Sequence, residues 1–172
     1  MRRITVGILW LAAYCSGVPP TPLIHAARAG DTARIRTLVA QGANPNLRAG
    51  VNRWTPLEHA VHKNQLASVA ALLDAGADPN AASPGGMTPL IMASGYGYTP
   101  IVKLLLHRGA NPRLADDNER NALDAAMSGT GDIDRITLFD CQRDTVATLR
   151  REAPTLAPSS PAQSGKWNRR CR

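Results

Sequence analysis

Three histidines are the residues whose types and spacing come nearest to a metal-binding or catalytic pattern. His25 and His59 lie at equivalent places in two similar segments, and His62 follows His59 by nearly one helical turn. Imidazole nitrogens are common zinc ligands, so a metal-dependent enzyme built on these three is one hypothesis. Stacked helical units, however, place their axes about 10 Å apart, which strains shared ligation of one ion. We therefore expect the three histidines to lie at helix surfaces without a metal.

No other motif for catalysis or cofactor binding occurs in the sequence. It contains no GxSxG, no phosphate-binding P-loop, no HExxH and no CxxC. We therefore predict a protein that is not an enzyme and that binds neither a cofactor nor a small-molecule substrate.

A repeated segment organises the middle of the chain. It opens with Thr-Pro-Leu at Thr21, Thr55 and Thr88, and a degraded copy begins at Asn121, so the period is 33 or 34 residues. Threonine caps the free N–H groups of a helix, and proline suits the first helical position. Apolar residues then recur at helical spacing, and a glycine that accepts the left-handed conformation ends the second helix. Each copy predicts a helix, a tight turn and a second helix, and its apolar face requires neighbouring copies.

The second helix of each copy carries a pair of apolar residues that keeps its register along the chain. The expected pairs are Leu38-Val39, Leu72-Leu73, Leu105-Leu106 and Leu138-Phe139. The last copy also contains the charged residues Asp132, Asp134 and Arg135, which suit the polar end of a stack. A further short helix is expected over residues 143–152, with Val146 and Leu149 spaced to lie against that stack.

The Thr-Pro-Leu opening, the Ala-rich first helix, the Leu-Leu pair and the Gly-Ala-Asp/Asn exit resemble ankyrin repeats over roughly residues 21–140. The resemblance implies an all-α ankyrin-repeat solenoid of about four stacked helix-turn-helix repeats with short β-hairpin fingers. The repeats are expected at about residues 21–54, 55–87, 88–120 and 121–152, the last as a C-terminal cap. The histidine usual after Thr-Pro-Leu in this family is replaced, and each replacement is expected to remove one capping hydrogen bond. The replacing residues are Ile24, Glu58, Ile91 and Asp124.

The resemblance also implies fingers that project between repeats. The candidate segments are Leu47–Trp54, Ala81–Met87 and Leu114–Arg120. Turn-forming residues at their tips support this assignment: Gly50, Gly85-Gly86 and Asp117-Asn118.

In proteins of this resemblance, partners contact the finger tips and the exposed positions of the first helices. We therefore predict a monomer that binds another protein through its concave face. Trp54 is the strongest candidate, because Trp, Tyr and Arg are the usual hot-spot residues of interfaces. The alternative is that Trp54 packs across its own finger onto the next one. The full set of candidate partner-binding residues is Arg53, Trp54, His62, Lys63, Met87, Tyr96 and Arg120.

The first 17 residues have the layout of a secretory signal peptide. A basic head is followed by an apolar run from Ile4 to Tyr14 and then by small residues. Cleavage after Gly17 would leave a repeat domain over residues 18–152 in the periplasm or secreted. Lipidation at Cys15 is a weaker alternative, because the bulky Tyr14 precedes it, and an uncleaved or cytoplasmic start is another.

Cysteine content agrees with export. Removal of the signal peptide discards Cys15 and leaves Cys141 and Cys171. An even number of cysteines in an oxidising compartment favours a Cys141–Cys171 disulfide. Two unpaired thiols are the alternative.

Charge is distributed unevenly, although the chain as a whole carries +7. Residues 18–149 carry twelve basic and twelve acidic side chains, so the excess lies at the two ends. Residues 153–172 are rich in Pro and Ser, end in KWNRRCR, and are expected to form a flexible basic tail. The favoured function is a small exported bacterial binding protein with an auxiliary, protective or immunity-type role. The alternative is a binder of the envelope surface or of nucleic acid that acts through this tail.

Overall fold

The computed structural model describes residues 21–129 and 141–159. Residues 1–20, 130–140 and 160–172 lie outside the described residues, and with them the predicted signal peptide and most of the predicted tail. The described chain forms eight α-helices and contains no strand. They are α1 (Pro22–Ala29), α2 (Thr32–Ala40), α3 (Pro56–His62), α4 (Leu66–Asp74), α5 (Pro89–Gly95), α6 (Thr99–His107), α7 (Ala122–Ser128) and α8 (Arg143–Glu152).

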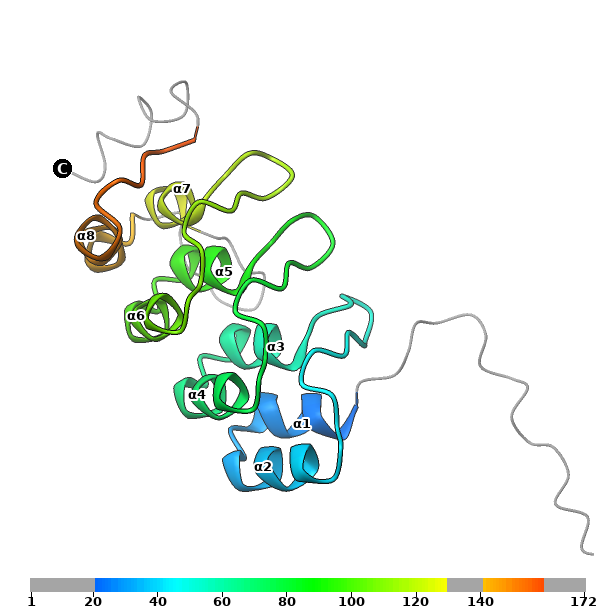
Figure 1. Cartoon of the computed structure of the whole chain (residues 1–172). Coiled ribbons are helices and arrows are strands. Elements are labelled where there is room, and N and C mark those ends of the chain that lie inside the picture. The colour runs from blue at the N-terminus through cyan, green and yellow to red at the C-terminus, as the bar shows by residue number, and fades with distance from the viewer. Residues whose placement is uncertain (1–20, 130–140, 160–172) are drawn as a thin grey trace, which may run out of the picture.

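The helices form two rows, as Figure 1 shows. The inner row runs α1, α3, α5, α7 and the outer row runs α2, α4, α6, α8, with contacts between successive helices in each row. Loops project from one side of the stack between successive pairs. This arrangement confirms the predicted all-α repeat solenoid. No helix among the described residues has the length and apolar character needed to cross a membrane.

The inner helices begin where the sequence predicts. The hydroxyl oxygens of Thr21, Thr55 and Thr88 each accept a hydrogen bond from the backbone N–H three residues on, at 3.2–3.3 Å. A proline follows each threonine at the start of the helix. Because these caps satisfy N–H groups that lack intrahelical partners, the Thr-Pro pair sets the first residue of each helix.

The residues that replace the family's usual histidine preserve more capping than expected. Glu58 Oε2 accepts from the backbone N–H of Thr55 at 2.7 Å, and Asp124 Oδ2 accepts from that of Asn121 at 3.1 Å. Both pairs are reciprocal capping boxes. The prediction that these two repeats lose a capping hydrogen bond is therefore wrong. Ile24 and Ile91 instead contribute buried apolar side chains.

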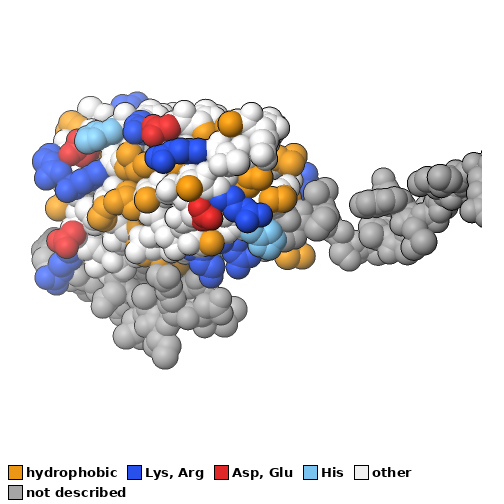
Figure 2. Space-filling model, turned by 90° about the horizontal axis from the view of Figure 1, so that it is seen from below, with side chains coloured by type: hydrophobic (Ala, Val, Ile, Leu, Met, Phe, Trp, Pro, Cys, Tyr) orange, Lys and Arg blue, Asp and Glu red, His pale blue; other side chains and the backbone are white. Residues whose placement is uncertain are grey.

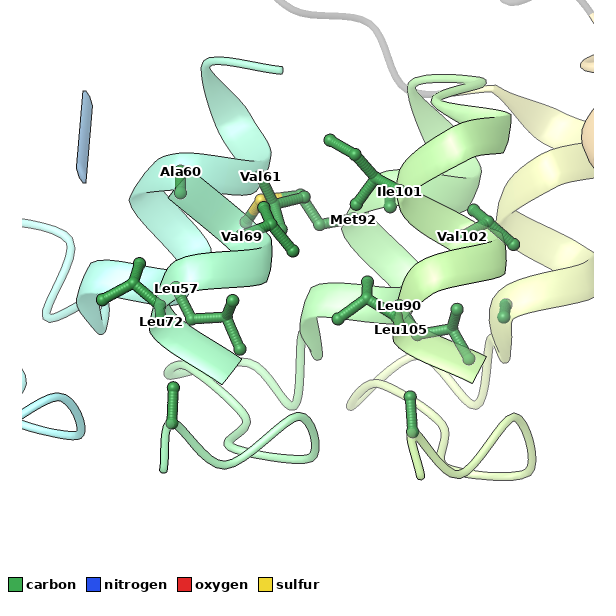
Figure 3. Packing of buried hydrophobic residues seen from close by; sticks show 14 of the residues in the cluster. Leu57, Ala60, Val61, Val69, Leu72, Leu90, Met92, Ile101, Val102 and Leu105 are labelled. Atoms are coloured by element: carbon green, nitrogen blue, oxygen red, sulfur yellow. The ribbon is translucent and has the colours of Figure 1, made fainter. Parts of the chain in front are cut away.

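The core lies between the two rows and continues from repeat to repeat. In Figure 3, Leu57 and Leu72 occupy the same places in the second repeat as Leu90 and Leu105 in the third. All four are essentially fully buried. Each such side chain contributes roughly 1.5–3 kcal/mol through the hydrophobic effect, so the stack is stabilised by its leucines.

Asparagine side chains join each repeat to the next along the outer loops. Asn46 donates to the carbonyl of Gly76 at 3.1 Å and accepts from the N–H of Asp78 at 2.8 Å. Asn80 makes the same two contacts one repeat later, with Gly109 and Asn111. These bonds hold successive repeats in a constant relation.

The fourth repeat differs from the predicted register. The N–H of Gln142 donates to Ala126 O at 2.9 Å, the bond that Tyr98 makes to Ala93 in the third repeat. The two residues are five positions apart in the third repeat and sixteen in the fourth, so the fourth repeat contains eleven additional residues between its helices. Helix α8 contacts both α6 and α7 and therefore takes the place of the outer helix.

This placement corrects the assignment of the last apolar pair. Leu149 of α8 is fully buried and corresponds to Leu105, whereas Leu138-Phe139 lies outside the described residues. The helix predicted over residues 143–152 is confirmed, but it is the second helix of the fourth repeat and not an addition to it. Asp132, Asp134 and Arg135 also lie outside the described residues.

The fingers are tight turns and not strand-paired hairpins. Each is closed by a backbone hydrogen bond: from Ala49 to Trp54 O at 3.2 Å, from Ser83 to Met87 O at 2.9 Å, and from Asp116 to Arg120 O at 3.0 Å. Only the first closure counts as an isolated β-bridge among the described residues. Only a few residues separate the two sides of each loop, so no ladder forms.

Residues 153–159 extend beyond the domain boundary expected at residue 152 and lie against the fourth repeat. Leu156 packs on the core, and Ala157 O accepts from Asn121 Nδ2 at 2.8 Å. The N–H of Ser159 donates to Asp124 Oδ2 at 3.0 Å. This segment covers part of the last repeat at the end of the stack, a surface that a further repeat would cover in a longer solenoid. Cys141 is a disulfide cysteine, but Cys171 lies outside the described residues, so their pairing stays a prediction.

Candidate protein-binding site

A hollow of about 190 Å³ lies between the first two fingers and the inner helices. We call it the Trp54 pocket, and its lining residues are Trp54, Ser83, Pro84, Met87, Met92 and Tyr96. Three of these were predicted as partner-binding residues: Trp54, Met87 and Tyr96. The structure therefore brings together residues from two fingers and from the end of α5.

A row of aromatic and imidazole rings borders this pocket. The ring centroid of Trp54 lies 5.3 Å from that of His59 and 5.1 Å from that of His62. His62 in turn lies 5.8 Å from Tyr96, which stacks on Tyr98 at 5.4 Å. These separations are those of favourable ring pairs, so each ring restricts the orientation of its neighbours. The rings connect the second repeat to the third on the side that faces the fingers.

The backbone on both sides of Trp54 is held in place. Before it, the first finger is closed by the Ala49–Trp54 bond, and Arg53 adopts a positive φ of 50°. After it, Thr55 is buried and caps α3. Trp54 is half-buried and packs against His59 and His62 of α3, and it lines the pocket together with residues of the second finger.

Burial shifts the pKa values of two ionisable groups on α3, shortly after Trp54, toward the neutral form. Burial, together with the positive charges of Arg28, His62 and Lys63, lowers the pKa of His59 to about 4. Burial also raises the pKa of Glu58, although hydrogen bonds from Thr55 oppose the rise. A neutral His59 beneath Trp54 favours an apolar or aromatic ligand group over an ionic one.

Arg120 lies apart from the pocket and is bound within its own finger. Its guanidinium donates two hydrogen bonds to Asp116 Oδ2, at 2.9 and 2.7 Å. Burial raises the pKa of Asp116, but the hydrogen bonds from Arg120 outweigh this and leave it below its usual value. Arg120 therefore stabilises the third finger, and its role as a partner contact stays a prediction.

The remaining predicted residues lie around the rim. Arg53 is exposed on the first finger, and Lys63 is half-buried at the end of α3, beside His62. Sequence reasoning missed Ser83, Pro84 and Met92. Met92 could have been found, because it occupies the position in the third repeat that His25 and His59 occupy in the first two.

The histidines do not form a metal site. Among the described residues, no group of three His, Cys, Asp or Glu side chains is arranged to hold an ion. His59 and His62 border Trp54, whereas His25 is exposed on α1. The described residues therefore do not bring His25, His59 and His62 together as shared ligation of one zinc ion would require.

Comparison with protein-family models agrees with the fold. A model described as "Ankyrin repeats (3 copies)" matches residues 8–83, and one described as "Ankyrin repeats (many copies)" matches residues 72–126. The first match begins inside the stretch predicted as a signal peptide. No curated protein matches the chain.

Proposed function

Because this chain belongs to the ankyrin repeat family, we propose that it is a non-catalytic module that binds one protein partner at the Trp54 pocket and the finger tips around it. Ankyrin repeats generally act as protein–protein interaction modules, which supports the class of function. The position of the contact is inferred from the pocket described above.

The observation that carries the proposal is the composition of the pocket. Trp54, Met87 and Tyr96 converge on one hollow while each stays only partly covered. Large aromatic side chains at the centre of a concave surface are the typical anchors of interfaces. On the same finger, Val51 is 95% exposed and Leu47 is 46% exposed, so a partner would cover further apolar surface there.

We place this activity outside the cytoplasm, in the periplasm or after secretion. The signal-peptide pattern of residues 1–17 and the even number of remaining cysteines support this location. An exported binding module without enzymatic motifs suits an auxiliary or protective role, such as neutralising an enzyme as an immunity protein does.

Trp54→Ala and Tyr96→Ala test the surface directly. We expect each to weaken partner binding about 30-fold or more, because truncating an aromatic anchor typically costs about 2 kcal/mol or more. Binding is measured by quantitative capture from periplasmic extract with residues 18–172 as bait, followed by titration of the captured partner.

Leu66→Ala is the matched control, because Leu66 is an exposed apolar residue on the outer helix α4. It should leave capture unchanged, and all three variants should keep the helical circular dichroism of the parent chain. Undiminished capture by both aromatic variants would exclude this surface as the binding site.

A further inference from the structure

We propose that the partner inserts an extended segment with a fixed order of charge: an acidic side chain at the first finger, an apolar side chain in the Trp54 pocket, and a basic side chain at the third finger. This inference rests on the proposed function, since it specifies the chemistry of the partner at the same site. It follows from the size of the pocket, its lining, and the charges on either side.

The three fingers carry different charges. Residues 47–54 contain two arginines and no acidic residue, and residues 81–87 contain no charged residue. Residues 114–120 contain three acidic residues and one arginine. The charge therefore changes from positive to neutral to negative along the row of fingers, although residues 18–149 as a whole carry no net charge. In the view of Figure 2, basic and acidic side chains are interspersed with hydrophobic ones.

Arg53 and the acidic pair Asp117 and Glu119 are the exposed charges of this gradient. Arg48 is partly compensated, because its Nη1 lies 3.8 Å from the buried carboxylate of Glu58. Asp116 is likewise compensated by its ion pair with Arg120. The charges that a partner meets are thus Arg53 at one end and Asp117 with Glu119 at the other.

Contacts between the second and third fingers make this surface continuous. The N–H of Asp117 donates to the carbonyl of Gly85 at 3.0 Å. A Cβ added to Gly86 would lie 2.9 Å from the Cα of Asp116, so the two fingers lie in direct contact. The acidic tip is therefore held against the finger that supplies Met87 to the pocket.

The pocket itself suits one apolar side chain. Its volume of about 190 Å³ is smaller than the 300–1,000 Å³ typical of small-molecule sites. Aromatic rings also bind cations, but the positive Arg53 and Lys63 nearby disfavour a cationic group here. The thioethers of Met87 and Met92 line the pocket and adapt to apolar groups. Nucleic acid is disfavoured, because Asp117 and Glu119 repel phosphates.

The spacing of the repeats gives the spacing of the motif. Packed helices lie about 8–10 Å apart, and an extended chain advances about 3.3 Å per residue. Because the pocket lies between the first two fingers, the acidic residue is expected about two positions from the apolar one. The basic residue is expected about four or five positions away on the other side.

A random peptide library displayed on phage tests the inference without knowledge of the partner. Residues 18–172, oxidised, are panned in parallel with Trp54→Ala, Arg53→Glu and the double variant Asp117→Lys/Glu119→Lys. We expect the parent chain to enrich peptides with the acidic–apolar–basic order. Trp54→Ala should lose the apolar position, Arg53→Glu the acidic position, and the double variant the basic position.

Titration of one enriched peptide by fluorescence polarisation provides the quantitative test. A peptide of the same composition with its two charged residues exchanged should bind about 10-fold more weakly at 0.05 M salt, and the difference should shrink at 0.5 M salt. Failure to enrich any peptide, equal binding of the two charge orders, or a dimer of the chain that Trp54→Ala dissociates would overturn the inference. Capture of a protein that depends on Trp54 would still support the proposed function in those cases, whereas Trp54-independent capture would contradict it.

Discussion

His59 shows how a single buried residue connects the binding surface to the stability of the fold. It is only 8% exposed, its ring meets Trp54 edge-on, and Nε2 has no hydrogen-bond partner among the described residues. A charged imidazole at this place would lose hydration and face Arg28 and Lys63, so the folded state keeps it neutral.

Acidification should therefore destabilise the protein through His59. Its pKa is about 4 in the folded chain against 6.5 for the free side chain, so the unfolded chain binds more protons between these values. The free energy of unfolding then decreases as the pH falls from about 6.5 to 4. Urea unfolding at several pH values should show a shallower decrease for His59→Gln than for the parent chain.

The control for this prediction is His25→Gln, since His25 is exposed at the equivalent place in the first repeat. Glu58 contributes with the opposite sign: its raised pKa makes the folded chain bind protons more readily, so stability from this group increases as the pH falls. Because the two contributions oppose each other in the parent chain, the effect of His59 is read from the difference between the pH profiles of the parent and of His59→Gln. Parallel pH profiles for His59→Gln and the parent would contradict the prediction.

At the residue scale, the sequence singled out three of the six residues that line the Trp54 pocket but not the other three. Trp54, Met87 and Tyr96 were predicted because they occupy finger and first-helix positions at which proteins of the ankyrin resemblance contact their partners. Ser83 and Pro84 carry no comparable pattern, because loop residues line a pocket only when another element faces them. Arg120 was assigned to the surface, since nothing in the sequence shows that Asp116 would hold it.

At the scale of elements, the outer helix of the fourth repeat is the main departure from prediction. Spacing of 33 residues favoured Leu138-Phe139 as the core pair, but the additional eleven residues shift that place to α8. Periodicity alone cannot reveal such an insertion when the inserted segment contains an apolar pair of its own. The contacts of α8 with α6 and α7 settle the register.

Leu149→Ala tests this register. Leu149 is fully buried, so its truncation should reduce the free energy of unfolding by about 2–5 kcal/mol, as expected for a leucine removed from a core. Chemical denaturation followed by circular dichroism measures the change. Arg150→Ala, at the adjacent exposed position, should stay within about 0.5 kcal/mol of the parent. Similar stabilities for the two variants would show that α8 does not close the stack.

At the scale of the whole molecule, the uneven distribution of charge separates the two candidate functions. In the proposed function, a protein partner binds along the charge gradient of the three fingers. In the alternative, the envelope surface or nucleic acid binds to the basic residues near the C-terminus. Residues 160–172 lie outside the described residues, so only an experiment on the intact chain compares the two.

Replacing Lys166, Arg169, Arg170 and Arg172 with serine removes the charge of this segment while keeping Cys171. We expect capture of the protein partner to be unchanged, because Arg53 and the Trp54 pocket remain intact. The measurement is the dissociation constant of the captured partner at 0.05 and 0.2 M salt. A large loss of affinity together with a weaker salt dependence would favour the tail as the binding element.

The sequence by itself determined the repeat unit, the first residue of each inner helix, and the apolar faces that make the repeats stack. These features depend on local spacing and on capping chemistry, which act within a few residues. Only the tertiary structure decided which helix closes the fourth repeat, that Arg120 belongs to its own finger, and that Trp54, Met87 and Tyr96 share one pocket. The closing helix and the shared pocket depend on contacts between segments that are distant in the sequence, and no local pattern encodes which of the possible neighbours is met. The Arg120–Asp116 ion pair joins residues only four positions apart, but it forms because the turn of the third finger brings the two side chains together.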